Sequence, residues 1–237
     1  MSLVPISYDV GGTRLTGYLA DGSGGGSAPG VLIAHEGGGL ARHTKERAER
    51  LAELGYVAFA LDMYGEEAPP LERAMALGRA LRGDVPRLRA IMTAALDILT
   101  AQPSVDPAGL AAIGYCMGGG AAIELARTGA PLKAVVAFHG GFLPGTPEEN
   151  EAISGRILIC HGDADPIVTA VQRDAFVEEL RAAGADWQLH LYGGVGHSFT
   201  NRDIDALGIA GFAYHAEADR RAWAAMLDLF EEVMETP

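Results

Sequence analysis

The chain has 237 residues, of which 49% are hydrophobic and 21% charged, a composition that suits a globular domain and excludes disordered and fibrous architectures. The formal net charge of −13 argues against a protein that grips nucleic acid or a membrane surface through its overall field. Two cysteines are too few for a disulfide framework, so we expect a reduced, cytoplasmic setting. The first ten residues do not resemble a signal peptide, and no apolar run reaches the roughly 20 residues of a membrane helix.

The chain opens with two strand-like stretches, 3–10 and 13–20, which are separated by Gly11 and Gly12. A two-glycine connection is typical of a tight hairpin, so we expect an antiparallel pair at the edge of a sheet. The glycine-rich segment 21–30 that follows has the composition of a linker. Only about 20 residues precede it, too few for a separate domain. We therefore interpret it as a loop inside one domain that spans residues 1–237.

Short apolar runs come next, and they are continuous rather than alternating, as in strands buried on both faces of a parallel sheet. They lie at 31–34, 56–61, 110–113, 134–138, 157–160 and 189–192. Helical patterns separate them, including an apolar stripe over 88–99 and a capping box from Thr169 to Gln172 whose helix runs towards Gly184. The sequence predicts a mostly parallel α/β domain with helices on both faces. In such a sheet, functional residues gather beyond the carboxyl ends of the strands.

Cys116 follows one of these strands in the segment Gly-Tyr-Cys-Met-Gly-Gly-Gly, and we expect a helix to begin near Ala121. A nucleophile with a small residue two positions before it and another two positions after it is typical of a strained strand-to-helix turn. Here the nucleophile is cysteine, where serine is commoner. The helix N-terminus would favour the thiolate, and the Met117 backbone N–H could stabilise an oxyanion. The alternative is a buried structural cysteine in a glycine-rich chain.

An acid and a base follow in the order that this fold uses. Asp163 and Asp165 come after the strand at 157–160, and His197 lies between Gly196 and Ser198 after the last strand. We favour Asp165 as the acid, because Asp163 is placed to make the turn. We favour His197 as the base over a solvent-exposed loop histidine. The strand-end histidines at 35, 139 and 161 lack the spacing of a metal site, so we predict neither a metal nor a cofactor.

The segment Ala-His-Glu-Gly-Gly-Gly at 34–39 supplies a second glycine-rich loop. Its glycines are typical of the loop that gives esterases a second oxyanion donor, here the Gly37 backbone N–H. Glu36 occupies one of the glycine positions of that loop. Its carboxylate could orient or deprotonate the thiol, or it could simply face solvent, and the residues alone do not separate these two interpretations.

Together these motifs make the chain similar to the dienelactone hydrolase family of the α/β-hydrolase superfamily. The resemblance rests on the Ala-His-Glu loop, Leu-Asp-Met-Tyr at 61–64, Gly-Tyr-Cys-Met-Gly-Gly, the Asp165 loop and Gly-His-Ser-Phe at 196–199. It implies a catalytic triad of Cys116, His197 and Asp165, with Glu36 contacting the thiol and an oxyanion hole at Gly37 and Met117. It also implies opening of enol-lactones through a thioester.

The resemblance further implies two arginines that hold a substrate carboxylate, one after the fourth strand and one four residues beyond the catalytic histidine. Asn201 stands at the second place, and Arg202 follows it. We therefore expect Arg73 and Arg202 to bind substrate together with Tyr64 and Phe199. Tyr64 lies in segment 62–83, where a lid or pocket wall with Met63, Met75 and Leu77 is expected.

The sequence thus predicts a cofactor-free hydrolase of activated esters or lactones, acting on a small molecule as a monomer or homodimer. Two alternatives stay open. The same triad could hydrolyse aryl esters or activated phosphotriesters, and the fold could instead be a non-catalytic binder or thiol sensor that uses Cys116 as a redox group.

Overall fold

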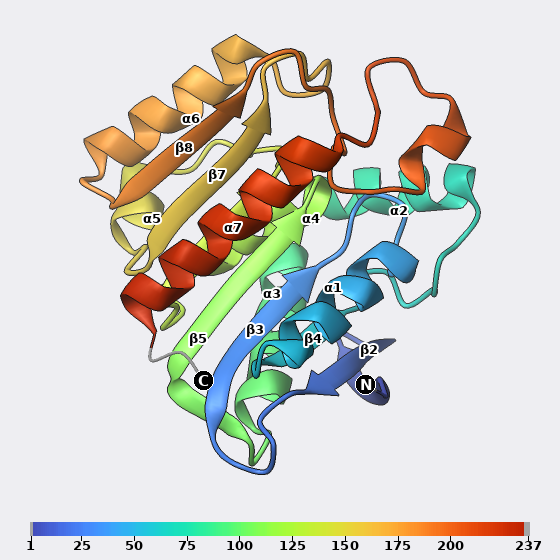
Figure 1. Cartoon of the computed structure of the whole chain (residues 1–237), viewed down its shortest axis with the longest axis vertical. Coiled ribbons are helices and arrows are strands. Elements are labelled where there is room, and N and C mark those ends of the chain that lie inside the picture. The colour runs from blue at the N-terminus through green and yellow to red at the C-terminus, as the bar shows by residue number, and fades with distance from the viewer. Residues whose placement is uncertain (1, 235–237) are drawn as a thin grey trace.

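The computed structural model describes residues 2–234, which build an eight-stranded sheet in the order β1-β2-β4-β3-β5-β6-β7-β8 (Figure 1). The strands are β1 Val4–Val10, β2 Thr13–Asp21, β3 Ala28–Ala34, β4 Val57–Leu61, β5 Val105–Tyr115, β6 Ala134–Phe138, β7 Arg156–Gly162 and β8 Trp187–Tyr192. The helices are α1 Arg42–Glu53, α2 Leu71–Arg82, α3 Val85–Thr100, α4 Met117–Ala126, α5 Pro147–Glu151, α6 Ala170–Ala182 and α7 Ala216–Val233, with a 3₁₀ turn η1 at Ile204–Leu207. None of the described helices combines the length and apolar character needed to cross a bilayer.

The predicted hairpin and parallel sheet are both confirmed. β1 and β2 pair antiparallel around Gly11 and Gly12, whose φ angles of 55° and 77° lie in the left-handed region that favours glycine. β2 also pairs antiparallel with β4, and every neighbouring pair from β4 to β8 is parallel. The glycine-rich segment is a loop between β2 and β3, as expected.

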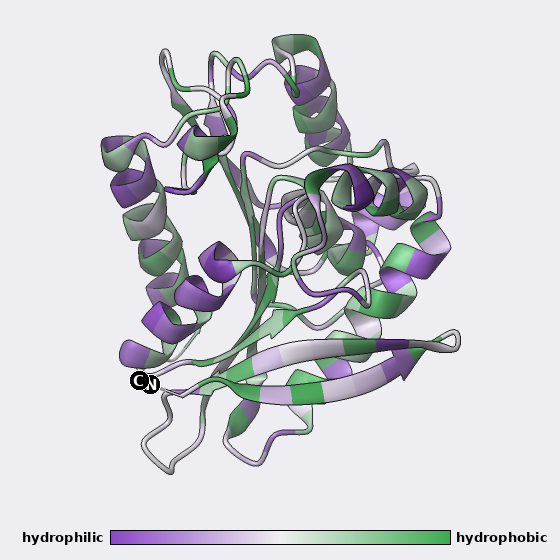
Figure 2. Ribbon diagram, turned by 90° about the vertical axis from the view of Figure 1, so that its right-hand side faces the viewer, coloured by the Kyte–Doolittle hydropathy of each residue, from purple (hydrophilic) through white to green (hydrophobic). Residues whose placement is uncertain are grey.

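Helices cover both faces of the sheet, as Figure 2 shows from the side. Side chains of α1 and α7 pack on one face, and those of α2, α3, α4 and α6 pack on the other. Alternate residues of a strand point to opposite faces of the sheet. In β3, Leu32 packs on the face covered by α2, α3, α4 and α6, and Ile33 packs on the face covered by α1 and α7. Both faces of the central strands are therefore buried, which is why their sequences are continuously apolar.

Two expectations about the elements are wrong. β8 lies at the edge of the sheet, and its residues are half-buried or exposed, so it is not a strand covered on both faces. The helix after Cys116 begins at Met117 rather than near Ala121, so three glycines lie inside its first turn. In contrast, the capping box of Thr169 and Gln172 starts α6 as predicted, and Gly184 with φ 67° follows its end.

Candidate active site

Cys116 occupies the turn between β5 and α4 in a strained backbone conformation with φ 53° and ψ −116°. A cysteine rarely adopts a positive φ, and such outliers persist only where the surroundings enforce them. The flanking glycines explain why the turn can close. A Cβ on Gly114 would lie 1.9 Å from the carbonyl oxygen of Gly118, so any side chain there would separate strand from helix.

The early start of α4 has the same steric origin. A Cβ on Gly118 would lie 2.3 Å from the Ala34 carbonyl oxygen, and one on Gly120 would lie 2.1 Å from the Gly141 oxygen. The glycines therefore let the first turn of α4 touch the ends of β3 and β6. Glycine is a poor helix former, which is why the sequence alone suggests a later start.

The structure brings three predicted residues together at this turn. The Nε2 atom of His197 lies 3.0 Å from the Cys116 sulfur, and its Nδ1 lies 2.6 Å from Oδ2 of Asp165. The other Asp165 oxygen accepts the backbone N–H groups of Ile167 and Val168 at 2.7 and 3.0 Å. Because the carboxylate accepts from Nδ1–H, Nε2 is the ring atom that faces the thiol.

The charges around His197 favour the protonated form of its imidazole. Burial disfavours the imidazolium, but the Cys116 sulfur and the Asp165 carboxylate outweigh it and raise the pKa of His197 to about 10. Burial alone would raise the pKa of Asp165, yet its bonds to His197 and to two backbone N–H groups hold it below its usual value. Asp163, in contrast, has a half-exposed side chain 3.9 Å from Arg173.

Comparison with known proteins places the chain in a family, because the sequence model of the dienelactone hydrolase family matches residues 15–234. The chain belongs to the dienelactone hydrolase family. The predicted resemblance is thereby confirmed, and so is a dienelactone hydrolase-like hydrolase function at the level of the family.

Two solved structures resemble the chain over 99% of its length and 99% of their own. One is a dienelactone hydrolase-like promiscuous phosphotriesterase, P91, from metagenomic libraries, with 42% identity and a TM-score of 0.95. The other is a protein named m3DLH, with 46% identity and a TM-score of 0.94. A Bradyrhizobium protein named "Probable 2-oxo-3-(5-oxofuran-2-ylidene)propanoate lactonase" is 27% identical, over 92% of this chain and 89% of its own.

Glu36, the acidic residue of the family motif, lies close to the triad but bonds elsewhere. One oxygen, Oε2, accepts from the Asn201 amide and lies 3.8 Å from Nδ1 of His43. The other oxygen, Oε1, is buried without a hydrogen-bond partner among residues 2–234. Burial raises the pKa of Glu36, and the Asn201 hydrogen bond only partly opposes this. The carboxylate therefore does not face solvent, and in this conformation no hydrogen bond joins it to Cys116.

Tyr64, predicted to bind substrate, connects the two loops expected to supply oxyanion donors. It is 6% exposed, and its hydroxyl donates to the Gly37 carbonyl at 3.0 Å and lies 3.6 Å from the Met117 sulfur. Met117 is the first residue of α4, where backbone N–H groups have no acceptor within the helix. Tyr64 also borders a cavity of 150 Å³ against α2, which lies in the segment expected to form a pocket wall.

The other three predicted substrate residues make their contacts with groups outside the triad. Phe199 has no exposed surface and packs edge-on against His139 and Tyr192, so it supports the His197 loop and cannot touch a bound ester. Arg73 is exposed, and its Nε lies 3.0 Å from Glu66. Arg202 lies over the Tyr214 ring at 5.4 Å, beside a separate cavity of 210 Å³ between α1 and α7.

Sequence reasoning missed several polar residues behind the triad. The strand-end histidines were noticed only as possible metal ligands, yet each holds a loop. His35 accepts from the Met63 backbone N–H at 3.1 Å, and His161 lies 3.2 Å from the Val168 carbonyl. The third of them, His139, contacts the backbone of Cys116 itself.

Proposed function

We propose that this protein hydrolyses activated carboxylic esters or lactones through a thioester on Cys116. The observation that carries the proposal is the line of hydrogen bonds from Asp165 through His197 to the Cys116 sulfur, at 2.6 and 3.0 Å. Cysteine nucleophiles need a neighbouring base held in orientation by a third group, and the three side chains have that relation.

In the proposed reaction, His197 takes the thiol proton and the Cys116 sulfur attacks the substrate carbonyl carbon. The backbone N–H groups of Gly37 and Met117 stabilise the negative oxygen of the tetrahedral intermediate. As the carbon–oxygen bond breaks, His197 donates its proton to the leaving oxygen. A water molecule then loses a proton to His197 and attacks the thioester, which releases the carboxylic acid and returns the thiol.

The nucleophile restricts the substrate class. In the tetrahedral intermediate a thiolate departs more readily than an ordinary alkoxide, so attack on an alkyl ester mostly reverses. Leaving groups of low basicity, such as the enolate of an enol-lactone or the phenolate of an aryl ester, depart in competition with sulfur. We therefore expect enol-lactones and aryl esters to be better substrates than triglycerides.

An activated phosphotriester is a second candidate substrate, because the 42% identical P91 structure is described as a promiscuous phosphotriesterase. The same thiolate would attack phosphorus in place of carbon, and the same oxyanion donors would face the phosphoryl oxygen. We propose this as a secondary activity of the same site.

The test compares wild type with Cys116→Ala and His197→Ala on enol-lactones, p-nitrophenyl esters and a p-nitrophenyl phosphotriester. We expect Cys116→Ala to lose at least about 10³-fold in kcat/KM. Cys160→Ala is the matched control, since Cys160 is fully buried and burial raises the pKa of its thiol to about 12. Its activity should stay near that of wild type.

Mass spectrometry of protein quenched during turnover adds a direct readout of the intermediate. His197→Ala should accumulate an acyl group on Cys116, because water attack on the thioester lacks its base. Turnover by Cys116→Ala at the wild-type rate would refute the proposal. Inactivity of wild type on the whole panel would favour the alternative of a binder or thiol sensor.

A further inference from the structure

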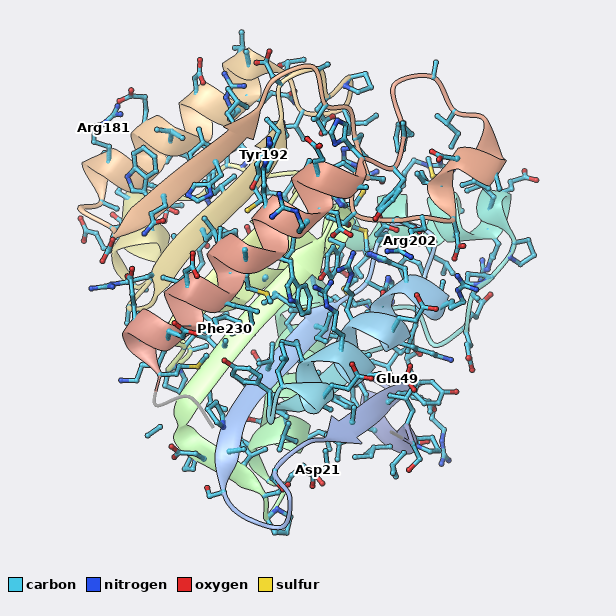
Figure 3. The ribbon with its side chains drawn as sticks, in the orientation of Figure 1. Asp21, Glu49, Arg181, Tyr192, Arg202 and Phe230 are labelled. Carbon is cyan, nitrogen blue, oxygen red and sulfur yellow. The ribbon has the colours of Figure 1, made fainter. Side chains whose placement is uncertain are left out.

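A group of buried polar side chains lies behind the triad and has no part in the proposed reaction. It comprises His139 at the end of β6, Thr200 in the loop after β8, and His43 and Arg47 on α1, each no more than 7% exposed. Arg202, labelled in Figure 3, marks the loop that carries Thr200 past α1 and α7. Most buried polar groups in proteins are hydrogen-bonded, so the partner of each atom indicates where its protons lie.

The first bond fixes the proton of His139. The backbone N–H of Cys116 can only donate, and it points at Nδ1 of His139 at 3.1 Å as well as at the Phe138 carbonyl at 3.0 Å. Nδ1 must therefore accept, which places the ring proton on Nε2. Nε2 lies 2.8 Å from the Thr200 hydroxyl and donates to it. The hydroxyl proton of Thr200 is then free for another acceptor.

The far end of the group fixes the second histidine independently. The Arg47 guanidinium only donates, and its Nε lies 3.3 Å from Nε2 of His43, which must accept. The same Nε2 lies 3.4 Å from the Thr200 hydroxyl, which donates a hydrogen bond to the lone pair that Arg47 also contacts. The proton of His43 is therefore on Nδ1, which lies 3.8 Å from Oε2 of Glu36 and has no hydrogen-bond partner among residues 2–234. The donor directions deduced from the two ends agree.

The chain of bonds requires both histidines to be neutral, and their surroundings keep them so. His139 is enclosed by groups that are positive when protonated, namely His197, His43, His161 and Arg47. Burial and these neighbours hold the pKa of His139 well below its usual value, while burial and Arg47 lower the pKa of His43 to about 3. His197, whose ring centre lies 5.2 Å from that of His139, is one of the groups that keep His139 neutral.

We propose that His139 is a positioning residue for the nucleophile, the first link of a one-directional hydrogen-bond chain from the Cys116 backbone through Thr200 to His43. The inference rests on the proposed function of Cys116. His139 acts on the nucleophile through the backbone of Cys116. The peptide plane before Cys116 determines the φ of 53°, and the His139 ring holds that plane by its N–H.

The other end of the chain is anchored by a buried ion pair. Nη2 of Arg47 donates to the Thr200 carbonyl at 2.7 Å and to Asp219 of α7 at 2.7 Å. Thr200 is thus held at its carbonyl as well as at its hydroxyl, and the next residue, Asn201, donates to Glu36. The chain therefore holds the nucleophile turn and the Glu36 loop in one arrangement.

The experiment measures alkylation of Cys116 by iodoacetamide across a pH series, beside the acylation rate with a p-nitrophenyl ester and the Tm. His139→Leu removes the side-chain acceptor for the Cys116 N–H and leaves only the Phe138 carbonyl, whereas His139→Asn keeps an acceptor oxygen at the place of Nδ1. Because His139 has a φ of 40°, which asparagine adopts more readily than leucine, the two variants are compared at equal Tm. We expect His139→Leu to lower both rates by about 10- to 100-fold, as for a misplacement approaching 1 Å, and His139→Asn to recover most of the loss. His190→Asn, on the edge strand β8, is the matched control.

Thr200→Val and Thr200→Ser form a second pair that does not depend on the folding of His139→Leu. Thr200→Val keeps the shape but breaks the chain, and it should lower both rates by about 3- to 10-fold, while Thr200→Ser should restore them. Wild-type alkylation rates and pH profiles in both His139→Leu and Thr200→Val would overturn the proposal. So would equal losses in His139→Leu and His139→Asn at equal Tm. Alkylation requires no ester turnover, so this result stands even if the hydrolase proposal fails.

Discussion

Gly118→Ala is the substitution that tests most sharply how the nucleophile turn is built. Its backbone φ is outside the positive region, and it lies in the first turn of α4, where alanine is favoured over glycine by up to about 1 kcal/mol. Propensity alone therefore predicts a more stable protein. The new Cβ, however, would lie 2.3 Å from the Ala34 carbonyl oxygen and 2.6 Å from that of His35.

Real Cβ contacts do not fall below 3.0 Å, so α4 and the end of β3 must separate by at least about 0.7 Å. Both contacts are backbone atoms of buried residues, which cannot rotate away. Overpacking of this kind costs about 1–3 kcal/mol, so after the gain in helix propensity we expect a net loss of up to about 2 kcal/mol in the free energy of unfolding. The same displacement moves Met117 away from the Gly37 loop, and a shift near 1 Å lowers the acylation rate by about 100-fold.

Denaturant unfolding and the pre-steady-state burst with a p-nitrophenyl ester measure the two effects separately. The matched control is Gly193→Ala, because a Cβ there meets no atom within 4 Å and the backbone φ is not positive. A Gly118→Ala protein as stable and as active as Gly193→Ala would refute the steric account of the turn.

Two further predictions concern charged groups. The pKa of His197 is raised to about 10, so its protonated form stabilises the folded state. This contribution is complete below about pH 6.5 and is lost as the pH rises through about 10. Unfolding free energies measured across that pH range should show the loss. Acylation should decline only as the pH approaches about 10, where the folded enzyme loses the His197 proton, and Asp165→Asn should move this decline and the loss of stability to lower pH. Arg47→Met should cost about 3–5 kcal/mol in unfolding free energy, because it leaves the buried Asp219 carboxylate unpaired, and the double variant Arg47→Met/Asp219→Leu should recover most of it. Equal unfolding free energies of the single variant and wild type would contradict that assignment.

The elements that the sequence predicts well are those in which local chemistry and tertiary packing agree. The Gly11-Gly12 turn and the Thr169 capping box require particular residues at particular positions, and continuous apolar strands need cover on both faces. The start of α4 and the exposure of β8 were missed because packing decides them. Gly118 is tolerated in a helix only because β3 passes close to it, and β8 looks like a central strand until its place at the sheet edge is known.

The same limit applies to the candidate site. Chain order and strand ends suffice to suggest Cys116, Asp165 and His197, because parallel strands carry their following loops to one edge of the sheet. The hydrogen-bond partners of His139 cannot be predicted from chain order and strand ends. Thr200 lies 61 residues along the chain, and neither the direction of a ring nor the position of its proton follows from sequence. Phe199 is predicted from the sequence to bind substrate, whereas its side chain is fully buried in the core.

Asn201 adds a constraint on the substrate that neither the family nor the triad supplies. Where the resemblance implies an arginine for a substrate carboxylate, this neutral amide is already bound by Glu36. The two arginines expected as replacements are engaged elsewhere, Arg73 by Glu66 and Arg202 over Tyr214. A net charge of −13 also disfavours the approach of anions. We therefore expect a neutral enol-lactone or aryl ester to have at least about tenfold higher kcat/KM than its carboxylate-bearing counterpart, a difference near 1.4 kcal/mol. Asn201→Arg should narrow that ratio, whereas a wild-type preference for the anion would show that another cation serves the substrate.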